Sequence, residues 1–169
     1  MIISLPTSPI SLSGIALALS LLCLGCAPAQ RFGSTAVARE RMDDQQVRER
    51  LWQAARTWLQ VPYRYGGMDR NGIDCSGLTV QIYRQAFAVE LPRTARQQMQ
   101  GGRFVRQPWL QAGDLLFFGD LRQTFQDHVG IYLGNNRFIH ATVNEGVVVS
   151  DLTSAYYRER LLTVRRYLP

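Results

Sequence analysis

The order of local patterns along the chain restricts its fold more than any other feature, because helical patterns come first and strand patterns follow. Apolar residues recur at helical spacing in residues 43–60 and 75–87, and a capping-box pattern at Thr94 predicts a third, short helix. Runs rich in β-branched and aromatic residues then follow: Leu115–Phe118, Val129–Leu133, Arg137–Thr142, Val147–Asp151 and Leu161–Leu168. Helices followed by strands predict an α+β domain with N-terminal helices packed on an antiparallel sheet.

The first helix is predicted from Asp43 to Gln60. Asp43 and Gln46 form a capping-box pattern, and Val61-Pro62 is expected to end the helix. One apolar stripe runs along it: Val47, Leu51, Ala54, Ala55, Trp58 and Leu59. The stripe predicts a helix that packs on the core and carries no chemistry of its own.

The N-terminal segment has the pattern of a signal peptide. Residues 1–30 contain no charged side chain, and Gly14–Gly25 is a continuous run of small and apolar residues. The run is too short for a membrane span and has the length typical of a signal-peptide core. We therefore expect the segment to be an export signal.

Two patterns of processing compete after this run. Leu24-Gly25-Cys26 resembles the end of a bacterial lipobox, in which Cys26 becomes lipidated, whereas Ala27-Pro28-Ala29 also fits ordinary signal cleavage. We favour the lipobox. The expected organisation is a signal peptide over residues 1–26, a tether over 27–41 and one folded domain over 42–169.

The chain is basic, and all of its 19 basic residues are Arg, which gives a formal net charge of +6. The Arg residues are dispersed and form no long run, so we expect a solvated basic surface. No nucleic-acid-binding motif is present, and no nucleic-acid partner is predicted.

Cys75 is the one cysteine of the predicted domain, since the other two of the 3 Cys lie at positions 23 and 26. The domain therefore cannot form an internal disulfide. Asp74 stands at an N-cap position, so Cys75 would lie in the first turn of a helix, where the helix dipole favours thiolate. Such a thiol suits nucleophilic catalysis. The alternative is a small buried side chain without reactivity.

His128 and His140 are the only histidines of the chain, and they fall in neighbouring predicted strands. A two-residue turn at Asn135-Asn136 would pair residue 134 with 137 and place the two imidazoles on opposite faces. A three-residue loop would pair 133 with 137 and place them on one face as diagonal neighbours. The second register also collects Val129, Ile131, Leu133, Ile139 and Ala141 on one core face. We therefore predict the second register.

One Cys at a helix start and two His on one sheet face supply the groups needed for thiol catalysis. Cys75 would attack a carbonyl, His128 would take the thiol proton, and His140 would orient His128. A zinc site is an alternative, although the spacing lacks a paired ligand motif. A purely structural role for both histidines is the second alternative.

An ordered set of motifs resembles the NlpC-type cell-wall cysteine peptidases over about residues 43–168. The motifs are Pro62-Tyr63-x-Tyr65-Gly66-Gly67, Asp74-Cys75-Ser76-Gly77-Leu78, Pro92-Arg93-Thr94, Gly113-Asp114-Leu115, His128-Val129-Gly130-Ile131-Tyr132 and Ile139-His140-Ala141. The resemblance implies a papain-like α+β fold. It also implies hydrolysis of peptide bonds in peptidoglycan stem peptides or cross-links, without a metal or other cofactor.

The same resemblance implies roles for single residues. Cys75 would be the nucleophile, His128 the base and His140 the orienting residue. Tyr63 would lie beside the nucleophile and help to polarise the site, with simple packing in a turn as the alternative. Substrate contacts are implied for three more positions, for which a helix cap or a surface role is the alternative: Asp74, Ser76 and Arg93.

The expected location is the bacterial cell envelope. With lipid on Cys26, the protein would be anchored in the outer membrane and face the periplasm, with peptidoglycan as its partner. A soluble periplasmic or secreted protein is the alternative. Two other functions stay open: a thiol amidase or acyltransferase on the same scaffold, and a catalytically silent lipoprotein that binds peptidoglycan.

Overall fold

The structure is a computed structural model that describes residues 42–119 and 128–169. The predicted signal peptide, the tether and the lipidation at Cys26 lie outside these residues. The helices are α1 (Asp44–Arg56), α2 (Cys75–Phe87), α3 (Ala95–Gln100), the 3-10 turn η1 (Gln107–Trp109) and α4 (Ala155–Arg160). The strands are β1 (Met68–Asp69), β2 (Gly72–Ile73), β3 (Arg103–Phe104), β4 (Leu115–Phe118), β5 (His128–Gly134), β6 (Arg137–Thr142), β7 (Gly146–Asp151) and β8 (Leu161–Arg166).

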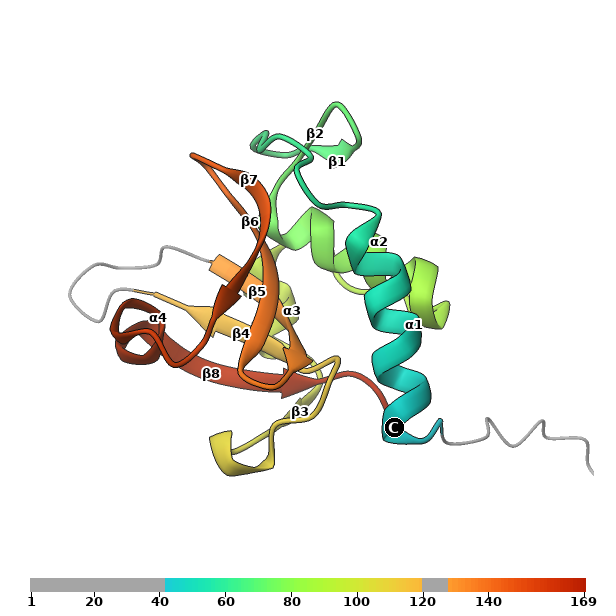
Figure 1. Cartoon of the computed structure of the whole chain (residues 1–169), viewed down its shortest axis with the longest axis vertical. Helices are drawn as coiled ribbons and strands as arrows, with labels where there is room; N and C mark the ends of the chain where they lie inside the picture. Colours follow the sequence, from blue (N-terminus) through green and yellow to red (C-terminus); the bar gives the residue numbers. More distant parts are fainter. Residues whose placement is uncertain (1–41, 120–127) are drawn as a thin grey trace, which may run out of the picture. The chain divides into compact units, whose positions relative to one another are not determined.

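A six-stranded antiparallel sheet in the order β3-β8-β4-β5-β6-β7 forms the centre of the domain. Strands β1 and β2 form a separate two-stranded pair. Figure 1 shows α1 and α2 together on one side of the sheet, and α4 near its other side. The prediction of N-terminal helices on an antiparallel sheet is therefore confirmed.

Alternation along the strands separates two apolar clusters, one on each face of the sheet. Leu115 and Phe117 of β4 belong to the larger cluster with α1 and α2, while Leu116 and Phe118 belong to the smaller one. The larger cluster also contains the residues expected to share a core face: Val129, Ile131, Leu133, Ile139 and Ala141. Packed side chains therefore cover both faces of the central strands.

Helix α1 begins as predicted, with a capping box between Asp43 and Gln46, but its predicted end at Gln60 is wrong. The helix ends at Arg56 because the following residues pair with β7 instead. The Gln60 N–H donates to Val147 O at 2.9 Å, and Gln60 has a positive φ of 65°. In this turn Leu59 is 40% exposed, so it does not belong to the predicted apolar stripe.

The β5–β6 hairpin has the predicted register along its body, since Ile131 pairs with Ile139 and Tyr132 with Phe138. Its loop differs from the prediction. Gly134 pairs with Arg137 across a two-residue turn whose residues both have positive φ. A β-bulge between Tyr132 and Gly134 then restores the register that the apolar face requires. The two-residue turn and the shared core face therefore occur together.

Four features have no counterpart in the sequence prediction: the β1–β2 pair, β3, η1 and α4. The strands among them are only two residues long, which is too short for a periodic pattern. Helix α4 has six residues and lies directly before β8. Strand β8 starts at Leu161, as predicted, but no helix was predicted in front of it. The position of this helix matters because α4 borders the candidate site.

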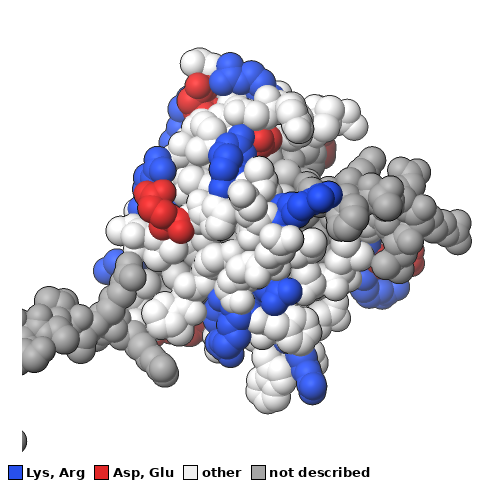
Figure 2. Space-filling model, turned by 180° about the vertical axis from the view of Figure 1, so that it is seen from behind, with Lys and Arg blue, Asp and Glu red and all other residues white. Residues whose placement is uncertain are grey.

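Basic side chains form separate groups, and no single continuous patch, on the face shown in Figure 2. Several arginines of the domain pair with neighbouring carboxylates, as Arg84 does with Glu90 at 2.8 Å. Exposed pairs of this kind contribute little to stability, because water screens the two charges. The prediction of dispersed Arg residues on a solvated surface fits this arrangement.

Candidate active site

Cys75 is the first residue of α2, as predicted, and its side chain is almost buried, with 8% of its surface exposed. The preceding residue, Asp74, has extended backbone and accepts a hydrogen bond from the Gly77 N–H at 2.6 Å. This is the N-cap that the sequence predicted. The candidate nucleophile is therefore fixed at the start of a helix whose apolar residues are packed in the core.

Asp74, Ser76 and Arg93 contact one another beneath the start of α2. Arg93 binds the Asp74 carboxylate at 2.7 and 3.0 Å and donates to Ser76 Oγ at 3.0 Å. Asp74 also accepts from the Gly66 N–H at 2.9 Å, which ties the preceding loop to the helix. These contacts hold the helix start in place, and a substrate contact by these three residues stays a prediction.

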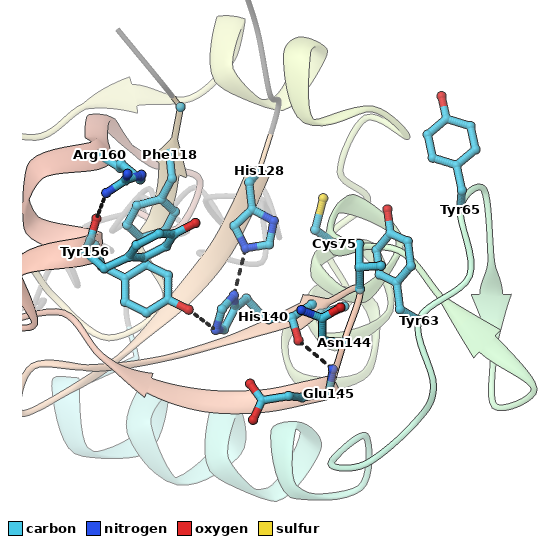
Figure 3. Close-up of a pocket in the computed structure, with 15 residues that line it drawn as sticks. Tyr63, Tyr65, Cys75, Phe118, His128, His140, Asn144, Glu145, Tyr156 and Arg160 are labelled. Carbon is cyan, nitrogen blue, oxygen red and sulfur yellow. Dashed lines mark hydrogen bonds between the residues drawn. The ribbon is translucent and has the colours of Figure 1, made fainter. Parts of the chain in front are cut away.

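The two histidines lie on one face of the sheet, as the predicted register requires. His128 Nε2 is 2.7 Å from His140 Nδ1. His140 Nε2 is in turn 2.8 Å from Ser150 Oγ and 3.4 Å from the Tyr157 hydroxyl. Figure 3 shows His128 between Cys75 and His140. The imidazole of His140 is thus held at both of its nitrogens.

Gly130 makes room for the pair of imidazoles. A Cβ at this position would lie 2.7 Å from Phe138 Cδ2, 2.9 Å from Ile139 O and 3.2 Å from His140 Cβ. Contacts this short to backbone and to a packed ring cannot be relieved by a small side-chain movement. The absence of a side chain at Gly130 therefore allows β5 and β6 to hold the two rings in contact.

Aromatic side chains surround His140, which is 1% exposed. The Phe138 ring centroid is 4.6 Å from that of His140, and the Tyr157 ring centroid is 5.3 Å away. Burial lowers the pKa of His128 to about 4, and burial together with the neighbouring His128 lowers the pKa of His140 to about 3. Both imidazoles are therefore neutral at pH 7.

The thiol of Cys75 is also neutral in this resting arrangement, which differs from the expected thiolate. Burial is the largest cause and raises the pKa of the thiol. Hydrogen bonds from the backbone N–H groups of Val129 and Ser76 oppose it, while the charge of Asp74 adds to it. The helix dipole contributes only about 0.3–1 kcal/mol, so the loss of solvation outweighs it.

A pocket of about 770 Å³ opens over Cys75, His128 and His140. Its other walls come from the loop before α2, the end of β4, the β6–β7 turn and α4. Tyr63 lines the pocket beside Cys75, and burial raises the pKa of its hydroxyl. Tyr63 thus reaches the predicted place and stays protonated, as a hydrogen-bond donor must.

Sequence reasoning missed several residues of this pocket and of its support. Ser150 lies on β7, and Tyr157 and Arg160 lie on α4. Ser150 could have been found by extending the parity argument from β6 to β7, because Phe138 pairs with Ser150. No comparable signal exists for the α4 residues, because their approach depends on the packing of a short helix against the sheet.

Among the described residues, no group of three or more His, Cys, Asp or Glu side chains is arranged to hold a metal ion. In the same part of the chain, no helix is long and apolar enough to cross a membrane.

Residues 60–166 match the sequence model of the NlpC/P60 family. The chain is 43% identical over 110 residues to "Probable endopeptidase NlpC" of Escherichia coli K12, covering 65% of this chain and 71% of that protein. It is 38% identical over 122 residues to "Murein DD-endopeptidase MepS/Murein LD-carboxypeptidase" of the same organism. That match covers 72% of this chain and 64% of the relative, so the chain spans less than two thirds of it.

A solved structure of an NlpC/P60 family protein from Bacillus cereus ATCC 10987 has the same fold. Its TM-score is 0.66 at 32% identity, over 72% of this chain and 40% of the other. The α+β, papain-like fold class predicted from the sequence is thereby confirmed. Helix α2 carries the cysteine, the sheet carries the two histidines, and the chain belongs to the NlpC/P60 family.

Proposed function

We propose that the protein is a cysteine endopeptidase that hydrolyses peptide bonds of peptidoglycan stem peptides or cross-links. The observation that carries the proposal is the 2.7 Å contact between His128 and His140 in the pocket that Cys75 also lines. The names of the relatives, a murein endopeptidase among them, support peptidoglycan as the substrate. The pocket is open and large enough for several peptide residues.

The hydrogen bonds of the two histidines suggest which nitrogen acts as the base. His128 Nε2 is engaged with His140 Nδ1, so Nδ1 of His128 is the nitrogen left for the thiol proton. For Nδ1 to accept, the proton of neutral His128 must be on Nε2, where it is donated to His140 Nδ1. His140 then carries its own proton on Nε2 and donates it to Ser150 Oγ.

The reaction then follows from these positions. Cys75 Sγ attacks the scissile carbonyl while its proton passes to His128 Nδ1, and the resulting imidazolium donates that proton to the leaving amine. Backbone N–H groups at the start of α2 and the hydroxyl of Tyr63, which lines the same pocket, would stabilise the oxyanion. Water activated by neutral His128 hydrolyses the thioester and restores the thiol.

Digestion of purified peptidoglycan tests the activity. The full chain and its Cys75→Ala variant should be incubated with the polymer, and the soluble fragments should be separated and weighed by mass spectrometry. Fragments that appear only with the wild type are expected, and their masses identify the bond that is cleaved. Unchanged peptidoglycan after incubation with folded protein whose Cys75 still reacts with an alkylating reagent would contradict the proposal.

The location of the protein at the envelope is a second part of this proposal. The apolar run and the Leu-Gly-Cys pattern support a lipid on Cys26 and an anchor at the outer membrane facing the periplasm. Incorporation of a fatty-acid probe into the wild type but not into Cys26→Ala is expected. An unlabelled mature protein that begins at residue 30 would contradict lipidation and support ordinary secretion.

A further inference from the structure

Arg160 and Glu145 are the only charged residues among the described residues that line the pocket. They come from different walls, Arg160 from α4 and Glu145 from the β6–β7 turn. Figure 3 shows Arg160 beyond Phe118 as seen from His128, while Cys75 and Tyr63 lie on the opposite side of His128. The cleft therefore has one basic end that is separate from the candidate nucleophile.

Contacts within α4 hold the guanidinium of Arg160 in position. Its Cζ lies 4.0 Å from the centroid of the Tyr156 ring, and Nη1 donates to Tyr156 O at 3.0 Å. The backbone is fixed as well, because the Gly119 N–H donates to Arg160 O at 3.0 Å. A side chain stacked in this way loses little conformational freedom when it binds a ligand.

No carboxylate pairs with Arg160 in residues 42–119 or 128–169. This distinguishes it from two other arginines that are partly or largely buried: Arg93 binds Asp74 at 2.7 Å, and Arg166 binds Asp114 at 2.6 Å. A guanidinium has five N–H donors, and the contact with Tyr156 O uses one of them. Arg160 lines the pocket, and its remaining donors have no acidic partner in the described part of the protein.

We propose that Arg160 forms a carboxylate-binding subsite at the α4 end of the cleft and selects substrates by a free carboxylate group of the stem peptide. The inference rests on the proposed function, because it names the feature by which that same site recognises its substrate. A planar guanidinium binds a carboxylate through two parallel hydrogen bonds, which an amide in the same place cannot match. Stem peptides offer such groups on γ-linked glutamate, on diaminopimelate and at the C-terminus.

A binding experiment tests the subsite without requiring turnover. The full chain carrying Cys75→Ala should be titrated calorimetrically with L-Ala-γ-D-Glu-diaminopimelate-D-Ala and with versions in which one carboxylate at a time is amidated. One amidation should weaken binding about 10- to 100-fold, the range expected for a charged hydrogen-bonded pair. Adding Arg160→Gln should weaken binding of the free peptide equally and abolish the difference between the free and that amidated peptide.

Matched variants separate recognition from other effects. Arg158→Gln removes the same charge from an exposed position of α4 that does not line the pocket, and it should leave both affinities unchanged. Arg160→Lys keeps the charge without the planar fork and should recover only part of the discrimination. Raising the salt concentration should weaken binding of the free peptide more than that of the amidated one.

Several results would overturn the subsite. One is that Arg160→Gln weakens binding of all the peptides equally, another is that it weakens none, and a third is that no peptide binds Cys75→Ala at millimolar concentration. Each of these results would show that Arg160 does not select peptides by binding a free carboxylate. The endopeptidase activity is assessed independently, by digestion with the wild type. Peptidoglycan cleavage together with equal binding of all peptides would leave the proposed function intact and refute only the subsite.

Discussion

Removing the hydroxyls that contact His140 should slow the reaction, because His140 is then no longer held in one tautomer. His140 Nε2 has two possible acceptors, Ser150 Oγ at 2.8 Å and the Tyr157 hydroxyl at 3.4 Å. Hydrogen bonding to these hydroxyls keeps the His140 proton on Nε2, which leaves His140 Nδ1 to accept a hydrogen bond from His128. If the proton moves to Nδ1, the proton of His128 is displaced to the nitrogen that should serve as the base.

The expected magnitude follows from these distances. A net hydrogen bond is worth about 1 kcal/mol, so Ser150→Ala should lower kcat about fivefold. Tyr157→Phe alone should lower kcat by less than about twofold, because the 3.4 Å distance from its hydroxyl to His140 Nε2 is near the outer limit of a hydrogen bond. The double variant leaves a buried donor without a partner, at a cost of about 1–3 kcal/mol, and should lower kcat about 5- to 150-fold. KM should change little in all three variants.

The assay combines steady-state kinetics with nitrogen NMR of the two imidazoles, because protonated and unprotonated ring nitrogens have different chemical shifts. The His140 Nε2 resonance should shift towards that of an unprotonated nitrogen in the double variant. Ser150→Thr keeps a hydroxyl at this position of the strand, so its nitrogen shifts and its kcat should be close to those of the wild type. A double variant with kcat within about twofold of the wild type and unchanged nitrogen shifts would refute the reasoning.

Acidification should lower stability, because the His128 pKa of about 4 lies below its ordinary value of 6.5. The unfolded chain therefore takes up a proton first, and stability present above about pH 6.5 is lost as the pH falls towards 4. The melting temperature should fall over this range, and less steeply in His128→Gln. Gly130→Ala should destabilise the fold by about 1–3 kcal/mol and reduce activity, since its methyl group would meet a ring carbon at 2.7 Å. Wild-type activity and melting temperature in this variant would count against the packing argument. Asp74→Ala should lower the free energy of unfolding by about 1–3 kcal/mol through loss of the cap and of the Arg93 pair, with Asp74→Asn in between. Equal denaturation midpoints for the two variants would contradict the role assigned to the charge.

The strand register could be predicted because one face of each strand must be apolar. A slip by one residue would have moved Ile131 or Ile139 out of the core, so the apolar pattern restricted the answer to one pairing. The loop that delivers this register could not be predicted by counting alone. A bulge adds a residue to one strand. The free-energy cost of this bulge depends on the backbone geometry at Gly134, where φ is 92°.

Local rules identified the start of each main helix but missed where α1 ends. The capping boxes at Asp43 and Thr94 depend only on residues three positions apart, and both are present. The end of α1 depends on β7, because Val147 O accepts from the Gln60 N–H and the Val147 N–H donates to Val61 O. An interaction between segments so far apart in the sequence leaves no local pattern, which also explains why the α4 residues of the pocket were missed.

The neutral resting state and the burial of His140 have a common cause. Aromatic rings on the second face of the sheet exclude water from His140, and the same exclusion lowers the pKa of both imidazoles. A preformed thiolate–imidazolium pair is therefore disfavoured, and the thiol proton has to move to His128 as the carbonyl is attacked. The hydroxyls of Ser150 and Tyr157 then matter more than a charged partner would, because they set the His140 tautomer without adding charge to a site that cannot solvate it.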